Sequence, residues 1–290
     1  MTNSFLYPKI WQALVLLAVV VGLQILVSIP FQILGWIKHP AVLALLGVLS
    51  FTPALVFGFT QARAPFDAVF PFTRVRVTLF VPLALLFLGN GVLLSEVDNC
   101  IKLVLPPPKL LTDYFESLVS GERGLWGSVL ALVVVAPVTE ELLFRGLILR
   151  GFLRNYSVRK SIIASALLFG ALHLNPWQFV PATVIGLWLG WVYVKTRSLL
   201  PCIFAHALNN GLSLLGAIVD VKIRGFSGAE AGEPAFQPLW LDATGLAMFG
   251  LGLWLCVRLF KQHESVPPVI AATVAGEIKV SSADQTEAKS

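Results

Sequence analysis

The sequence predicts an all-α fold: a polytopic membrane protein with about eight transmembrane helices that enclose a polar cavity within the membrane. Two observations lead to this prediction. Of the 290 residues, 57% are hydrophobic and 13% are charged, with a mean hydropathy of +0.81, whereas a soluble domain carries about a quarter charged residues. Apolar runs of about 20 residues, the length that crosses a bilayer as a helix, also recur along the chain.

Eight such runs are expected to span the membrane. The first is too long for a signal peptide, and no small-residue cleavage site follows it. The fifth is short, so we expect it to be tilted or to end inside the membrane. Residues 1–262 would then form one transmembrane domain, and the Ser-, Ala- and Thr-rich tail 263–290 is predicted to be disordered. The eight runs are 10–35, 41–60, 77–95, 126–152, 161–175, 179–195, 199–219 and 239–260.

The basic residues predict which side of the membrane each loop faces. The net charge of +5 is scattered over short loops, a distribution typical of orientation signals and not of a nucleic-acid-binding patch. Loops on one side carry most of the Lys and Arg, and acidic residues dilute the basic residues on the other side. By the positive-inside rule, both termini and the tail are cytoplasmic. The basic set is Lys9, Arg63, Arg74, Arg76, Arg150, Arg154, Arg159, Lys160, Lys195, Arg197, Arg258 and Lys261.

The longest connection, 96–124, lies on the opposite side. Thr112 or Asp113 could cap a short amphipathic helix at the outer interface, with a role as a lid. A solvated linker is the alternative that loop statistics favour. The three scattered cysteines, Cys100, Cys202 and Cys256, do not have the spacing of a disulfide framework or a CxxC metal site. They are predicted to be packing residues.

A first polar group interrupts the fourth apolar run. Glu140 and Glu141 follow one of the most apolar stretches of the chain, and Arg145 lies four residues beyond Glu141. Residues four apart on a helix are neighbours, so Glu141 and Arg145 are expected to form an ion pair, which leaves Glu140 as the free, reactive carboxylate. Pro137 removes a backbone hydrogen bond and is expected to free the carbonyl of Val133. Ionisable residues within a membrane indicate a functional site.

Two further polar groups lie in later runs. Phe169 and His173 are predicted to share one helix face, as are His206 and Asn210. At 1.5 Å per residue, Glu140 lies about 18 Å from the cytoplasmic end of its span, His173 about 18 Å from residue 161, and His206 about 10 Å from residue 199. These depths predict one site in the cytoplasmic half of the membrane or near its midplane. Residue patterns alone leave two functions open: a hydrolytic enzyme, or a transporter or helix-binding scaffold that uses the same polar cluster. The sequence shows no internal repeat with paired broken helices, which argues against the transporter.

The three groups together resemble a known signature. The run from Pro137 to Arg145, then Phe169 with His173, and then His206 with Asn210 are similar in order and spacing to the motifs of the CAAX protease and bacteriocin-processing family of intramembrane proteases, also called Abi proteins. The resemblance covers about residues 126–215, the expected protease core. It implies an intramembrane endopeptidase, similar to CAAX prenyl protease 2, that acts on a membrane-tethered, lipidated or bacteriocin-like peptide. Compact loops and the lack of a targeting segment favour a bacterial plasma-membrane protein, and the depths of the site residues favour a site that faces the cytoplasm.

The resemblance also implies roles for the site residues. Glu140 would activate a water, with Glu141 beside it, and His173 would help to position that water. His206 and Asn210 would donate hydrogen bonds to the oxyanion of the tetrahedral intermediate, and Arg145, Phe169 and Pro137 would support the site. In a metal-dependent version, Glu140, His173 and His206 would coordinate Zn²⁺. A metal-free mechanism is equally compatible with these residues, and no HExxH motif is present.

Overall fold

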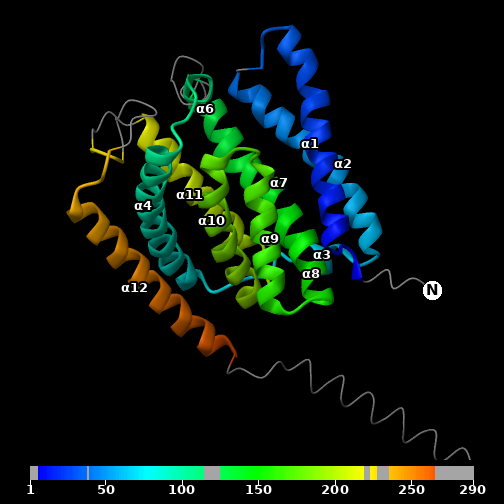
Figure 1. The fold of residues 1–290 in the computed structure, drawn as a ribbon. Coiled ribbons are helices and arrows are strands. Elements are labelled where there is room, and N and C mark those ends of the chain that lie inside the picture. Colours follow the sequence, from blue (N-terminus) through cyan, green and yellow to red (C-terminus); the bar gives the residue numbers. More distant parts are fainter. Residues whose placement is uncertain (1–5, 38, 114–124, 219–222, 227–234, 265–290) are drawn as a thin grey trace, which may run out of the picture.

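The computed structural model describes residues 6–37, 39–113, 125–218, 223–226 and 235–264 (Figure 1). Within these residues the fold is all-α and contains no β-strand, which confirms the predicted class. Most of the tail 263–290, like residues 114–124 of the long connection, lies outside the described part of the chain. Residues 109–113 are already helical, so Thr112 and Asp113 do not act as the predicted N-terminal caps.

In the described part of the chain, eight long helical segments follow one another, and the fourth has several parts. That segment consists of α6 (Leu125–Ser128), the π-helix η4 (Val129–Val135), α7 (Ala136–Glu141), the π-helix η5 (Leu142–Leu149) and α8 (Arg150–Asn155). We call it the fourth helix. The other seven are α1 (Ile10–Ile33), α2 (Pro40–Ala62), α4 (Phe80–Val104), α9 (Val158–Leu172), α10 (Pro176–Thr196), α11 (Leu200–Ile218) and α12 (Leu239–Glu264), with the short α3 (Phe66–Val69) and η2 (Val77–Leu79) between α2 and α4.

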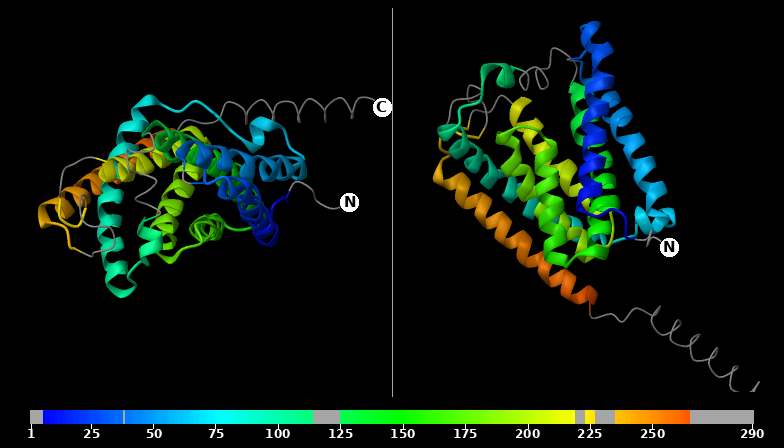
Figure 2. Two further views of the ribbon diagram at one scale, coloured as in Figure 1. Left: turned by 90° about the horizontal axis from the view of Figure 1, so that it is seen from above. Right: turned by 45° about the vertical axis from the view of Figure 1, so that its right-hand side comes forward.

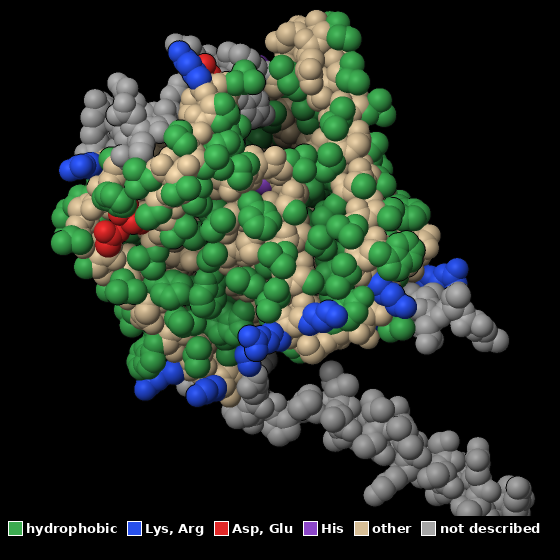
Figure 3. Space-filling model, in the orientation of Figure 1, with side chains coloured by type: hydrophobic (Ala, Val, Ile, Leu, Met, Phe, Trp, Pro, Cys, Tyr) green, Lys and Arg blue, Asp and Glu red, His purple; other side chains and the backbone are tan. Residues whose placement is uncertain are grey.

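Six helices in the described residues are long and apolar enough to cross a membrane: α1, α2, η2 with α4, the fourth helix, α10 and α12. The remaining two predicted spans are α9 and α11. Helix α9 has only 15 residues, and the apolar sequence of α11 is interrupted by the polar residues His206, Asn209 and Asn210. The chain is therefore an integral membrane protein whose two least typical spans border the predicted site. Apolar side chains cover the face shown in Figure 3, and Lys and Arg gather along its lower edge, where α8 ends.

Local interactions explain where the helices begin and end. Ser157 caps α9 by accepting a hydrogen bond from Lys160 N, and Asn175 caps α10 by accepting from Gln178 N. The prediction that the third span ends at residue 95 was too short, because α4 continues to Val104. Its last turns carry polar side chains that bind a later segment: Asn99 Nδ2 donates to Gly225 O at 2.7 Å.

The helices form a bundle with two flanking pairs. The pair α1–α2 covers one flank and the pair α4–α12 the other, with the fourth helix, α9, α10 and α11 between them (Figures 1 and 2). Glycines allow close approach in both the flank and the centre. A Cβ added at Gly186 would lie 3.0 Å from Ala166 Cα, and one at Gly190 would lie 3.1 Å from Ile162 Cγ2. These two glycines therefore allow α10 to pack closely against α9.

Gly252 of α12 provides a test of the α4–α12 contact. An added Cβ would lie 2.8 Å from both Leu86 Cα and Pro82 O, which are backbone atoms that no side-chain rotation can move. We expect Gly252→Ala to lower the free energy of unfolding by about 1–3 kcal/mol, the usual cost of overpacking. Gly250→Ala is the matched control, because nothing lies within 4 Å of its added Cβ. Thermal unfolding in detergent checks both variants, and equal stability of the two would contradict this packing.

Candidate active site

The fourth helix departs from α-helical geometry on both sides of its two carboxylates. The π-helices η4 and η5 flank α7, which carries Glu140 and Glu141, and π-helical turns often occur at functional sites. In the i→i+5 pattern of η4, the missing N–H of Pro137 leaves the carbonyl of Leu132 without its helical partner. The expectation that Pro137 frees the carbonyl of Val133 was wrong, because it assumed α-helical geometry. Asn210 Nδ2 donates to Leu132 O at 2.9 Å.

The bond between Asn210 and Leu132 joins α11 to η4. It supplies the donor that Pro137, which has no N–H, cannot offer to Leu132 O. We expect Asn210→Leu to lower the free energy of unfolding by about 1 kcal/mol, the size of an interhelical hydrogen bond in a membrane protein. In a Pro137→Ala background the new N–H can serve Leu132 O, so the same substitution should cost less. Thermal unfolding of the two single variants and the double variant measures this coupling. Strict additivity would contradict it.

A buried ion pair lies directly beside Glu140. Arg145 Nη1 donates to Glu141 Oε1 at 2.8 Å, and the two side chains are 1% and 0% exposed. The second terminal nitrogen of Arg145 donates to Gly186 O at 3.1 Å on α10. The guanidinium also lies over the ring of Phe169, 5.0 Å from its centroid. The ion pair expected from the sequence is therefore present, and it joins the fourth helix to α9 and α10.

His206 lies between the two carboxylates. Its Nδ1 is 2.9 Å from Glu141 Oε1, and a carboxylate that is already bound to Arg145 accepts this bond, so Nδ1 is the donor. The other ring nitrogen, Nε2, lies 3.9 Å from Glu140 Oε2. Glu140 is 15% exposed at its side chain, against 0% for Glu141. The structure thus holds one carboxylate in an ion pair and leaves the other partly accessible, facing His206.

Phe169 is the central apolar contact of the site. Its ring packs edge-on against Phe144, His173 and His206, with centroid separations of 5.0, 5.3 and 5.5 Å. His173 is the residue that ends α9, and its Nδ1 lies 3.0 Å from Phe169 O. Because a carbonyl accepts, Nδ1 carries the hydrogen and Nε2 is left as an acceptor. Among the described residues, no hydrogen bond joins His173 to Glu140.

Asn175 supports His173 and was not predicted from the sequence. Its Nδ2 donates to His173 O at 3.2 Å and to Gln178 Oε1 at 2.6 Å, while its Oδ1 accepts from Gln178 N at 2.8 Å. Leu174, between the two, has a positive φ of 56°, a strained conformation for a leucine. An Asn followed by Pro after an apolar run is a recognisable sign of a helix start, so the cap could have been found from the sequence.

The predicted zinc ligands can be compared with this geometry. Glu140 Oε2 and His206 Nε2, 3.9 Å apart, are close enough for two ligands of one ion. The part of the chain that the structure describes contains no group of three or more His, Cys, Asp or Glu side chains arranged to hold a metal ion. The zinc site with Glu140, His173 and His206 therefore stays a prediction, and the chemistry below uses the side chains alone.

Comparison with known families supplies independent evidence. Residues 122–212 match the family model for type II CAAX prenyl endopeptidases, Rce1-like. The family resemblance is confirmed. The Rce1-like segment contains every predicted site residue, from Pro137 to Asn210, and it points to a protease of the CAAX endopeptidase type. Neither a search of curated proteins nor one of solved structures finds a significant match.

Proposed function

We propose that this protein is an intramembrane endopeptidase that hydrolyses a peptide bond of a membrane-tethered or lipidated substrate with a water activated by Glu140. One observation carries the proposal: Glu140 Oε2 and His206 Nε2 face each other at 3.9 Å, while Glu141 is held in an ion pair. The Rce1-like match favours hydrolysis over transport or scaffolding. The bilayer and a membrane or lipidated peptide are the partners that this function requires.

Glu140 is the general base in this mechanism. With His206 in its imidazolium form, a water between Glu140 Oε2 and His206 Nε2 can donate a hydrogen to Glu140 and accept one from His206, which holds the water in place. Glu140 takes a proton from the water, and the resulting hydroxide adds to the carbonyl carbon of the scissile bond. The protonated Glu140 then gives this proton to the leaving amine as the C–N bond breaks. His173 Nε2, an acceptor, would help to orient the water from the α9 side.

His206 and Asn210 stabilise the oxyanion. When His206 is protonated, its Nε2–H donates to the developing negative charge, while the carboxylate of Glu141 stabilises the imidazolium through Nδ1. Asn210 uses one hydrogen of its amide for Leu132 O, and its second hydrogen remains for the oxyanion. Arg145 holds Glu141 in place through their ion pair, so the pair acts on the reaction through His206.

A mass-spectrometric survey of peptide termini tests the proposal. Cells that carry the wild-type protein are compared with cells that carry Glu140→Gln at equal membrane levels. We expect a discrete set of new peptide termini that appears with the wild type alone, and these termini identify the substrate and the cleaved bond. Identical termini in both cell lines, also at raised expression, would refute the hydrolytic function.

A further inference from the structure

Side-chain burial changes along the fourth helix at Glu140 and Glu141. On the side that leads to α8, every residue from Leu143 to Phe152 is buried. On the other side, between residues 125 and 138, the buried residues are Ser128, Ala131 and Pro137, and Trp126 is 82% exposed. The fourth helix is therefore densely packed on one side of the carboxylates and loosely covered on the other.

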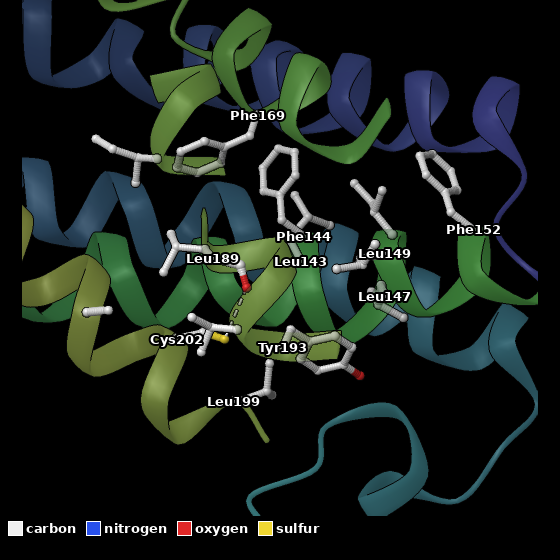
Figure 4. Close-up of a cluster of buried hydrophobic side chains, with 14 of the residues drawn as sticks. Leu143, Phe144, Leu147, Leu149, Phe152, Phe169, Leu189, Tyr193, Leu199 and Cys202 are labelled. Carbon is white, nitrogen blue, oxygen red and sulfur yellow. Dashed lines mark hydrogen bonds between the residues drawn. The ribbon is translucent and has the colours of Figure 1, made fainter. Parts of the chain in front are cut away.

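Helix α11 shows the same change. Between its start and His206, four residues of α11 are buried, including Cys202 and His206 itself. Between His206 and its end at Ile218, one residue is buried, Leu214. The buried side chains from the two helices meet those of α10 and form a continuous apolar cluster, which we call the plug (Figure 4). The plug includes Leu147, Leu149, Phe152, Leu189, Tyr193, Leu199 and Cys202.

The plug lies between the site and the basic end of the bundle. Arg150 and Arg154 begin and nearly end α8, and Arg197 follows α10 at the same end. The side chains of the plug are 0–3% exposed, so a water or a peptide that comes from the basic end meets close-packed protein before it reaches Glu140.

Among the described residues, the opposite direction is less obstructed. Helix α9 starts beside the end of α8, and its 15 residues extend for about 22 Å, whereas the fourth helix, with 31 residues, extends for about 46 Å. The wall formed by α9 therefore ends part-way, at His173, and Leu174 next to it is 71% exposed. Figure 3 shows a histidine side chain at the floor of a hollow in the upper half of the molecule, away from the basic lower edge.

We infer that the substrate reaches Glu140 from the end of the bundle opposite the basic residues. Under the positive-inside rule that end is non-cytoplasmic. The inference rests on the proposed function and narrows its substrate class to a peptide segment presented at the non-cytoplasmic leaflet: an exported lipidated peptide, or the outward-facing juxtamembrane segment of a membrane protein. It replaces the cytoplasm-facing site expected from helix depth alone.

Thiol labelling of intact cells tests the direction of access without any catalysis. In a Cys100→Ser background the remaining Cys202 and Cys256 are buried. A maleimide reagent should therefore label only a cysteine that is introduced at an exposed site. A membrane-impermeant maleimide should label Leu174→Cys from outside, and should label Arg159→Cys, at the basic end, after permeabilisation only. Labelling of Leu174→Cys from the cytoplasmic side, or its failure to react from either side, would overturn the inference.

Two reporters then connect access with cleavage. Each has one membrane anchor and the cleavable segment found in the termini survey, placed outside the membrane in one reporter and in the cytoplasm in the other. We expect the wild type to cut the outer reporter at least tenfold faster than the inner one, and Glu140→Gln to cut neither. Cleavage of the inner reporter alone would overturn the access inference and leave the proposed function intact. Failure to cut either reporter, with the expected labelling pattern, would instead count against hydrolysis.

Discussion

Replacement of Glu140 by Gln should lower the rate of peptide-bond hydrolysis by about 10²–10⁴-fold, the usual contribution of a general base. Gln has nearly the same shape as Glu, but its amide cannot take a proton from water at neutral pH. Single-turnover cleavage of the peptide found in the termini survey, with purified protein in detergent, measures this loss. Glu140→Asp keeps a carboxylate one methylene farther back, so an intermediate rate is expected.

Stability separates this effect from misfolding. Glu140 Oε2 is buried and has no hydrogen-bond partner among the described residues, so the substitution breaks no hydrogen bond of this oxygen. The thermal midpoint of Glu140→Gln should therefore equal or exceed that of the wild type. A Glu140→Gln enzyme with more than a tenth of the wild-type rate would contradict the role of Glu140 as the base.

Glu141→Gln should have the largest effect on stability, a loss of about 3–5 kcal/mol of unfolding free energy, because it leaves the guanidinium of Arg145 buried without a counter-charge. Both side chains are almost completely buried, and Glu141 Oε1 accepts bonds from Arg145 and His206. Denaturation in a mixed detergent system, followed by circular dichroism, measures the loss.

The double variant Glu141→Gln/Arg145→Met is the matched control. It removes both charges and keeps the approximate volume, so it should recover much of the stability that the single variant loses. It should not recover activity, because His206 Nδ1 no longer donates to a carboxylate. If the stability losses of Glu141→Gln and Arg145→Met, each measured alone, simply added in the double variant, the ion pair would not couple the two residues.

Interactions local in sequence were predictable, and interactions between helices were not. The four-residue spacing of Glu141 and Arg145 was enough to predict their ion pair, because neighbours on a helix are fixed by its period. The bonds from Arg145 to Gly186 O and from Asn210 to Leu132 O join helices distant in sequence. Their acceptors are backbone carbonyls, which no side-chain pattern reveals.

The limits of hydropathy explain the remaining differences. The third span was predicted too short because Glu96 and Asn99 end the apolar run, although the helix continues and uses them to bind the segment near Gly225 and Gln237. Depth along each span placed the site residues at similar heights, but it carries no information on packing. The plug between the site and the basic end follows from the structure alone, and the proposed direction of access rests on it.

Cleavage in water enriched in ¹⁸O tests the central claim, Glu140-dependent hydrolysis, most directly. The purified wild-type protein is incubated with the peptide identified in the termini survey, and the products are analysed by mass spectrometry beside those of Glu140→Gln. We predict two products with one ¹⁸O atom in the new carboxyl group for the wild type, and intact peptide for Glu140→Gln. Intact peptide with the wild type, or equal labelled cleavage by both proteins, would contradict it.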